Sequence, residues 1–208
     1  MHTPRALITL SAASAVALLG ASCASQPSSE DPASESVVHL SADYPEYGST
    51  EAALEAADVV VVGTVESSRD LIEYPEINDS GAGLENPQSG VEVSNEDLEA
   101  MAVVTTVTTI RVSEVISGDA EVGDSVEVSQ LGGTSEGVTY IEDSTTFIEE
   151  VDSPEVLLLL NDFGEGRYDL VNPIEGIYGV SDGEFESLPG VDFDSEMSSL
   201  EEVREFTE

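Results

Sequence analysis

Two short segments of this chain are continuously apolar, and both are typical of strands buried on two faces. Residues 59–62 are four consecutive valines, and residues 156–160 are a valine followed by four leucines. Each run is too short for a helix of ordinary length and is bounded by acidic or turn-forming residues, as central strands are. The two runs therefore predict the middle of a β-sheet.

The longest strand signal covers residues 101–117, where valines and isoleucines stand among threonines that also suit strands. Its apolar side chains change parity between Val107 and Ile110. Because side chains of a strand alternate with a period of two, a shift of one residue indicates a bulge or strong coiling of the strand near Thr108 and Thr109, as in a strand that curls around a small barrel.

Shorter strands are expected on both sides of the second apolar run. Residues 125–131 alternate regularly, and residues 167–171 alternate and should pair with that run through a glycine-containing turn. Short β segments are expected at 176–180 and 184–186. Residues 134–153 are irregular and acidic, with enough apolar side chains either to dock on the domain or to form a weak hairpin.

Two short helices are expected near the ends of the domain, at residues 49–57 and 195–207. The first has a hydroxyl N-cap and an acid in its first turn, where the helix dipole favours negative charge. For the second, two capping boxes fit the sequence, Ser198 with Glu201 or Ser199 with Glu202.

Residues 67–100 are rich in Gly, Pro, Asn and acids and contain few apolar side chains. This segment is expected to be a long acidic insertion at the surface, of a length that is uncommon unless the segment is mobile or functional. The remaining length of 37–208 suits one domain with a core of its own.

Residues 1–22 have the organisation of a secretory signal. Arg5 precedes an uncharged apolar stretch at 6–20 and a small-residue run that ends at Cys23, the only cysteine. The stretch is shorter than the roughly 20 apolar residues that span a bilayer. The residues before Cys23 resemble the lipobox of bacterial lipoproteins, which implies that Cys23 is lipidated and becomes the N-terminus. The alternative is ordinary cleavage after Ala24.

Lipidation at Cys23 places the protein at the cell membrane, anchored on its extracytoplasmic face, with the membrane as its first partner. Two or three acyl chains, palmitate among them, hold such an anchor stably, whereas one chain is marginal. Residues 23–36 are too polar to bury anything and are expected to form a disordered tether. Fully extended, this tether reaches up to about 45 Å.

The chain that follows the signal is strongly acidic. It has four arginines, no lysine and 44 acidic residues, a net formal charge of −40. Binding of nucleic acid through its phosphates is excluded, because that requires clustered Lys and Arg. The acidity fits a hydrated surface suited to high salt, and it also fits binding of divalent cations or of basic partners.

The order of these segments resembles a group of bacterial secreted and lipoprotein domains of unestablished function, similar to the OB-fold domain of tissue inhibitors of metalloproteinases and netrin-like modules. The resemblance covers roughly residues 50–180 and consists of valine and glycine patterns, with Ser117-Gly118 where the group has Lys-Gly. It implies a mainly β fold, a small five-stranded Greek-key barrel whose face binds ligands. Protease inhibition in that family needs a disulfide-bonded N-terminal cysteine that chelates zinc. A lone, lipidated Cys23 does not fit that role.

Candidate catalytic and metal-binding residues are few. His39 is the only histidine after the signal, so a Ser-His-Asp triad or a zinc site with several His or Cys ligands is not expected. Asp192, Asp194 and Glu196 have the spacing of the first three calcium ligands of an EF-hand. Methionine and valine stand at the later glycine and glutamate positions, so these acids are weak calcium candidates.

A second oxygen cluster is formed by Asn161, Asp162 and Glu165, for which a turn is the simpler explanation. No cofactor is expected other than calcium. The function expected from the sequence is therefore a lipid-anchored, non-catalytic binding or envelope-interaction module for an unidentified protein or small molecule. The alternative is a secreted hydrolase that uses carboxylates, with or without calcium.

Overall fold

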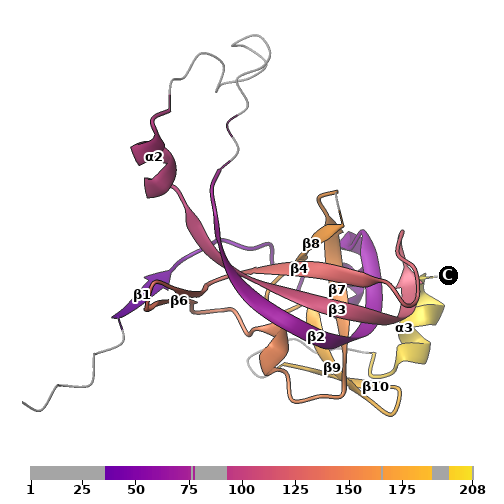
Figure 1. The fold of residues 1–208 in the computed structure, drawn as a ribbon. Coiled ribbons are helices and arrows are strands. Elements are labelled where there is room, and N and C mark those ends of the chain that lie inside the picture. Colours follow the sequence, from indigo (N-terminus) through magenta and orange to yellow (C-terminus); the bar gives the residue numbers. More distant parts are fainter. Residues whose placement is uncertain (1–35, 76, 78–92, 165, 189–196, 208) are drawn as a thin grey trace, which may run out of the picture. The chain divides into compact units, whose positions relative to one another are not determined.

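The computed structural model describes residues 36–75, 77, 93–164, 166–188 and 197–207. This part of the chain is mainly β, with ten strands in two sheets and a few short helices (Figure 1). No helix among these residues is long and apolar enough to cross a bilayer. The predicted signal, Cys23, nearly all of the tether, and Asp192, Asp194, Glu196 and Glu165 lie outside the described residues.

Seven strands form the larger sheet, in the order β10-β9-β7-β2-β3-β4-β8. A further pairing between β7 and β8 joins five of them, β7, β2, β3, β4 and β8, into a closed ring. All contacts around the ring are antiparallel except β4 with β8, which is parallel. The bounds are β2 Val59–Glu73, β3 Val103–Ser117, β4 Ser125–Leu131, β7 Glu155–Asp162, β8 Arg167–Leu170, β9 Ile177–Ser181 and β10 Glu184–Ser187.

The smaller sheet has three strands in the order β1-β6-β5: β1 Ser36–Leu40, β6 Val138–Glu142 and β5 Gly133–Ser135. The helices are α1 Thr50–Ala56, α2 Asn95–Ala100, α3 Leu200–Thr207 and a 3₁₀ turn, Ile148–Glu150. The irregular segment 134–153 therefore satisfies both expectations for it. It forms the β5–β6 hairpin, and it docks on the domain through the fully buried Ile148.

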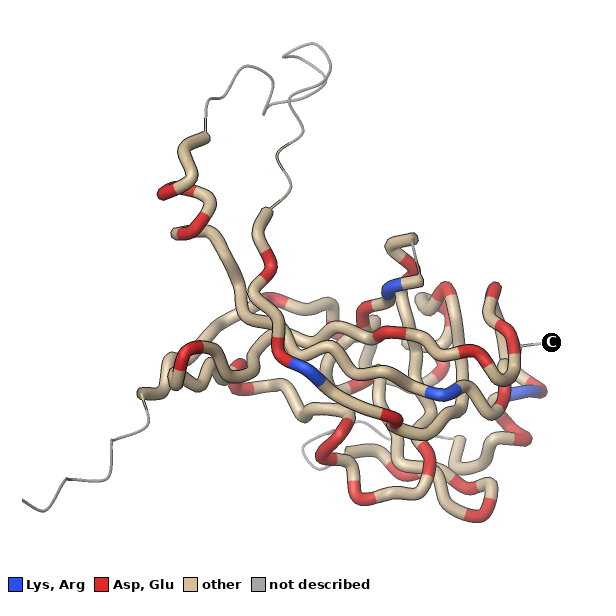
Figure 2. Tube along the Cα trace, in the orientation of Figure 1, with Lys and Arg blue, Asp and Glu red and all other residues tan. Residues whose placement is uncertain are grey.

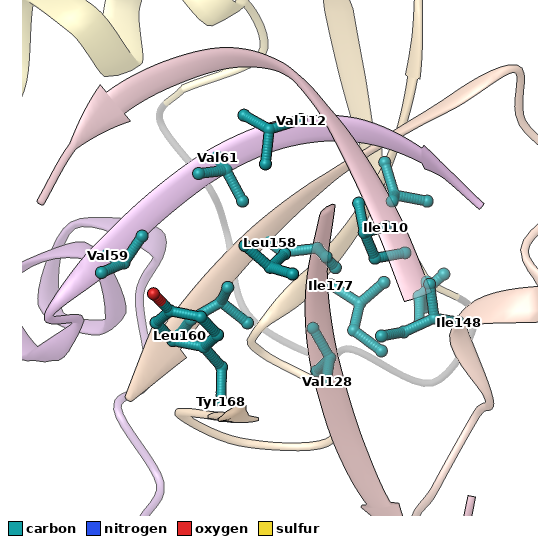
Figure 3. Packing of buried hydrophobic residues seen from close by; sticks show 13 residues of the cluster. Val59, Val61, Ile110, Val112, Val128, Ile148, Leu158, Leu160, Tyr168 and Ile177 are labelled. Atoms are coloured by element: carbon teal, nitrogen blue, oxygen red, sulfur yellow. The ribbon is translucent and has the colours of Figure 1, made fainter. Parts of the chain in front are cut away.

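The continuous apolar runs of β2 and β7 are buried on both faces, as predicted. Val59, Val61, Leu158 and Leu160 belong to the core cluster shown in Figure 3. The alternate residues of both strands belong to a second cluster, which includes side chains of α1 and α3: Val60, Val62, Leu157, Leu159, Ala53, Leu54, Leu200 and Val203. Two separate cores therefore require these strands to be apolar at every position.

The bulge predicted near Thr108 and Thr109 is not in β3, whose pairing with β4 is continuous from Thr105 to Arg111; the irregularity lies on the partner strand β2. Val65 pairs with Ile110 and Ser67 with Thr109, so the register shifts by one between them and Glu66 is the additional residue. The change of parity along β3 reflects burial of both of its faces, because residues 104–108 are all buried.

The segment expected to be an insertion is shorter than 67–100. β2 continues to Glu73, because residues 67–73 pair with β3 residues 103–109. Backbone pairing, rather than apolar side chains, supports this polar half of the strand. Near the other end, α2 begins after Ser94, which forms a capping box with Asp97.

Both expected terminal helices are present. Ser49 caps α1, accepting a hydrogen bond from the backbone of Ala52. At α3, the second of the two capping boxes is the one formed. The Ser199 side chain accepts from the Glu202 backbone at 3.4 Å, and Glu202 accepts from the Ser199 backbone at 3.1 Å.

Candidate functional site: the Asp169 cavity

A cavity of about 330 Å³ lies against the ring of strands, within the size range of small-molecule sites. We name it the Asp169 cavity. Residues from β2, β3, β4, β7 and β8 line it, together with the segment before α1 and the loops after β6, β7 and β8. The lining residues are Tyr44, Pro45, Glu73, Thr105, Ser129, Gln130, Leu131, Thr145, Asn161, Phe163, Asp169, Leu170, Val171 and Pro173.

Strand register brings the central residues of this cavity together. Thr105 of β3 pairs with Leu131 of β4. Ser129 of β4 pairs with Asp169 of β8, which also pairs with Asn161 of β7. Since paired residues on neighbouring strands share one face of a sheet, these five side chains form one continuous surface.

The loop between β8 and β9 holds the opposite wall in place. The Asn172 side-chain amide donates to the carbonyl oxygen of Pro45 at 2.7 Å. The two carboxylate oxygens of Glu175 accept from the backbone N–H groups of Tyr47, at 2.8 Å, and Gly48, at 3.1 Å. Asn172 and Glu175 are both buried, so the wall that carries Tyr44 and Pro45 is fixed by several buried hydrogen bonds.

Thr105 is the most unusual residue of the lining. Its side chain is only 6% exposed, and its hydroxyl has no hydrogen-bond partner among the described residues. A buried hydroxyl without a partner costs about 1–3 kcal/mol of stability. The hydroxyl oxygen has almost no accessible surface, so it faces the protein interior and a ligand in the cavity does not reach it.

Asp169 contributes negative charge to the cavity lining and is exposed. Partial burial raises the pKa of its carboxyl above the ordinary value; the positive charge of Arg167 opposes this shift and the negative charge of Glu73 adds to it. Burial also raises the pKa of Tyr44, helped by the negative charges of Glu142 and Asp169. Among the described residues, no hydrogen bond reaches the Asp169 carboxylate. The cavity therefore combines an apolar interior with an unpaired acceptor.

Every arginine in the described part of the chain is paired with a glutamate. The pairs are Arg69 with Glu127, Arg111 with Glu66, Arg167 with Glu73 and Arg204 with Glu114. Figure 2 shows these arginines as isolated blue segments among many red ones. Arg167 also donates to the Ser129 hydroxyl at 2.7 Å. The described surface therefore offers no unpaired arginine to bind an anion.

The residues singled out from the sequence contribute little to this site. His39 lies on β1, where its exposed ring is 3.0 Å from Asp143. Asn161 lines the cavity, but Asp162 accepts from the backbone of Gly164 at 2.7 Å, which supports the turn interpretation. Within the described ranges, no group of three or more His, Cys, Asp or Glu is placed to hold a metal ion.

Sequence reasoning missed Thr105 and Asp169. A threonine inside a strand signals only β-propensity. One acid among 44 carries no signal of its own, and only strand pairing brings these two residues to one cavity.

Comparison with known protein families and with curated proteins finds no match to this chain.

Proposed function

We propose that this chain is a lipid-anchored, non-catalytic binding module on the extracytoplasmic face of the cell membrane, which holds a small molecule in the Asp169 cavity. The observation that carries the proposal is the cavity itself, which lies against the ring of strands and has Asp169 in its lining. Mostly apolar walls with a few polar groups are typical of small-molecule sites.

The barrel of this module is OB-like. Three consecutive antiparallel strands, β2, β3 and β4, followed by β7 and β8, with β8 parallel to β4, support a five-stranded Greek-key barrel. OB-folds bind ligands on the second and third strands and on the loop between the fourth and fifth. The corresponding elements here are β3, β4 and the loop that contains Phe163, and all three line the Asp169 cavity.

Binding can be tested with a substitution that fills the cavity. The purified chain would be exposed to a small-molecule extract of its host, washed, and measured by native mass spectrometry. Leu131→Trp should abolish retention of a small molecule, while Val122→Trp, at a residue 67% exposed outside the cavity, should leave it unchanged. Failure of the unsubstituted chain to retain any small molecule would contradict the binding function.

The proposal of a lipid anchor depends on the sequence around Cys23. Cys23→Ser should move the protein from the membrane fraction to the soluble fraction and stop incorporation of a clickable palmitate analogue. Ser28→Ala, in the tether, should change neither. If the Cys23→Ser variant and the parent are found in the soluble fraction to the same extent, ordinary cleavage after Ala24 is the better explanation.

One observation favours the alternative, a carboxylate-based hydrolase. Glu73 and Asp169 line the same cavity, and the pKa of Asp169 is raised, as in many catalytic acids. Glu73, however, is engaged by Arg167, which accounts for its position without catalysis. After prolonged incubation, a molecule bound by a non-catalytic module should be recovered chemically unchanged. A hydrolase should instead release cleavage products, and Asp169→Asn should stop their formation.

A further inference from the structure

The smaller sheet ends in an edge strand, β1, that the described residues leave uncovered. β1 pairs with β6 on one side, and within the described ranges its backbone makes no hydrogen bond to any other segment. Val37 is 46% exposed and Val38 is 39% exposed, and they point to opposite faces because successive side chains of a strand alternate. Such an edge, with free backbone groups and apolar side chains, is a template for pairing with another strand.

The other edges of the two described sheets are protected. β10, the end strand of the larger sheet, carries the exposed acids Glu184 and Glu186, and the backbone N–H of Phe185 donates at 2.9 Å to the segment before α3. On β5, the backbone N–H of Thr134 donates to Asp70 at 3.0 Å. Charged side chains and covering segments are the usual means of keeping an edge strand from pairing. β1 has neither among the described residues.

Charge indicates which partner can pair with β1. Its five residues include no acid, lysine or arginine, although the chain after the signal has 44 acids. The exposed acid nearest to it in this sheet, Asp143, already lies 3.0 Å from the ring of His39. A basic peptide therefore finds no carboxylate on the strand, and an acidic strand is repelled by the rest of the chain. The partner that fits is a neutral strand, and β1 of a second copy is such a strand.

Two copies of β1 can pair with all five residues of each strand. Identical strands pair antiparallel about a two-fold axis, so that the same residues are used on both sides. With the axis at Val38, this residue lies opposite Val38 of the second copy, and Val37 lies opposite His39 of the second copy. The pairing covers the two exposed valines together with the free backbone groups, and cross-strand contacts of this kind stabilise sheets.

We propose that β1 is a self-association edge, at which two copies of this chain join the three strands of each smaller sheet into one sheet of six. A single strand pair is smaller than the interfaces of about 1,000 Å² or more that hold stable complexes, so the dimer is weak in dilute solution. Copies anchored in one membrane by the tether before β1 would meet at a higher effective concentration. The pairing itself depends neither on the anchor nor on the Asp169 cavity.

Disulfide trapping tests the pairing directly. Cys23 is the only cysteine, so Cys23→Ser combined with one new cysteine gives a chain with a single thiol. Val38→Cys places two thiols opposite each other, where paired residues have Cβ atoms about 4.5–5.5 Å apart, close to the span of a disulfide. Mild oxidation should therefore yield a covalent dimer.

Two matched variants control the trapping. Val37→Cys, on the same strand, has its counterpart displaced by two positions, at about 7–8 Å, and should cross-link several-fold more slowly. Val122→Cys, at a 67% exposed residue in the turn between β3 and β4, should show only the background rate of random collisions.

Sedimentation of the Cys23→Ser chain measures the equilibrium without oxidation. Val38→Asp should abolish the concentration-dependent dimer, because it places two acids opposite each other, whereas Val122→Asp has the same charge change and should retain it. Raising salt from about 0.15 M to 1 M shortens the Debye length from about 8 Å to 3 Å. Dimerisation should then tighten several-fold, since repulsion between the two acidic chains is screened. Circular dichroism shows whether Val38→Asp remains folded, and the trapping result decides if it does not.

Several results would overturn the proposal. It is wrong if Val38→Cys cross-links no faster than Val122→Cys, if Val37→Cys cross-links faster than Val38→Cys, or if Val38→Asp stays folded and dimerises like Val122→Asp. Trapping of Val38→Cys to another protein of the host, in place of a second copy, would likewise overturn it and assign the edge to that protein. Retention of a small molecule by the Asp169 cavity is measured separately, so the proposed function and this inference can fail independently.

Discussion

Asn172 donates a hydrogen bond of 2.7 Å to the carbonyl oxygen of Pro45, which is 127 positions away in the sequence. The other half of the Asn172 amide accepts from the backbone N–H groups of Ile174, at 2.7 Å, and Glu175, at 3.0 Å. One buried side chain thus shapes the loop between β8 and β9 and holds the wall of the Asp169 cavity against it. Stability and the candidate site are linked through this residue.

Asn172→Ala should lower the free energy of unfolding by about 1–3 kcal/mol, because it leaves buried backbone groups without partners. It should also weaken retention of a small molecule by the cavity, since Pro45 lines it. Urea denaturation and native mass spectrometry measure the two effects. Asn95→Ala, at an exposed position of α2, should change neither. Equal stability of the Asn172 variant and the parent would show that this contact does not hold the wall.

Thr108→Val should raise the free energy of unfolding by about 1–2 kcal/mol. The hydroxyl of Thr108 is buried without a partner, and valine keeps the shape of the side chain while removing the unsatisfied group. Thr134→Val, at an exposed position of β5, should have a much smaller effect. A loss of stability for Thr108→Val would imply that the hydroxyl has a partner, such as a buried water.

Asp169→Asn should stabilise the unliganded protein slightly at neutral pH, by less than about 1 kcal/mol because the side chain stays partly solvated. The pKa of Asp169 is raised in the folded protein, so the folded state binds its proton more tightly than the unfolded state. The stabilisation from the Asp169 carboxyl is therefore fully present below its pKa in the unfolded chain. It is lost as pH rises through its pKa in the folded protein.

The melting temperature of Asp169→Asn should therefore exceed that of the parent by an amount that increases as pH rises from about 4, the ordinary pKa of Asp. The difference should become constant above the raised pKa. Asp119→Asn, an exposed turn substitution of equal charge change, provides the comparison at each pH. A parent that is more stable than Asp169→Asn at pH 7, without ligand, would contradict the raised pKa.

Gly133→Ala should be strongly destabilising, by about 2 kcal/mol or more. Gly133 has a φ of +134°, and an added Cβ would lie 2.6 Å from Oδ1 of Asp70 and 2.8 Å from Oγ1 of Thr106. Those two side chains bond to each other at 2.9 Å, and Asp70 accepts from the Thr134 backbone at 3.0 Å. The crowded position is therefore part of the connection between the two sheets.

Gly137→Ala separates the two causes of that loss. Gly137 has a φ of +80° but no neighbour within 4 Å of an added Cβ, so it reports backbone strain without crowding. Its variant should lose only about 1 kcal/mol, measured by the same denaturation curves. Similar losses at both glycines would mean that contact with Asp70 does not matter.

The sequence alone determined the features that depend on a residue and its near neighbours. The apolar runs at 59–62 and 156–160 predicted central strands because burial on both faces excludes polar side chains. Ser49 and the Ser199–Glu202 pair marked helix starts because capping is local. The end of β2 was misplaced because polar residues such as those at 67–73 are stabilised by a partner strand about 40 positions away.

Only the tertiary structure decided the candidate site. Strand patterns encode which face is buried, not which strand lies alongside, so the parallel pairing of β4 with β8 was not predictable from alternation. That pairing places Asp169 beside Ser129, while the register of β3 with β4 places Thr105 beside Leu131. Asp169 is one of 44 acidic residues along the chain, and for this reason it became informative only once strand pairing placed it in the lining of a cavity.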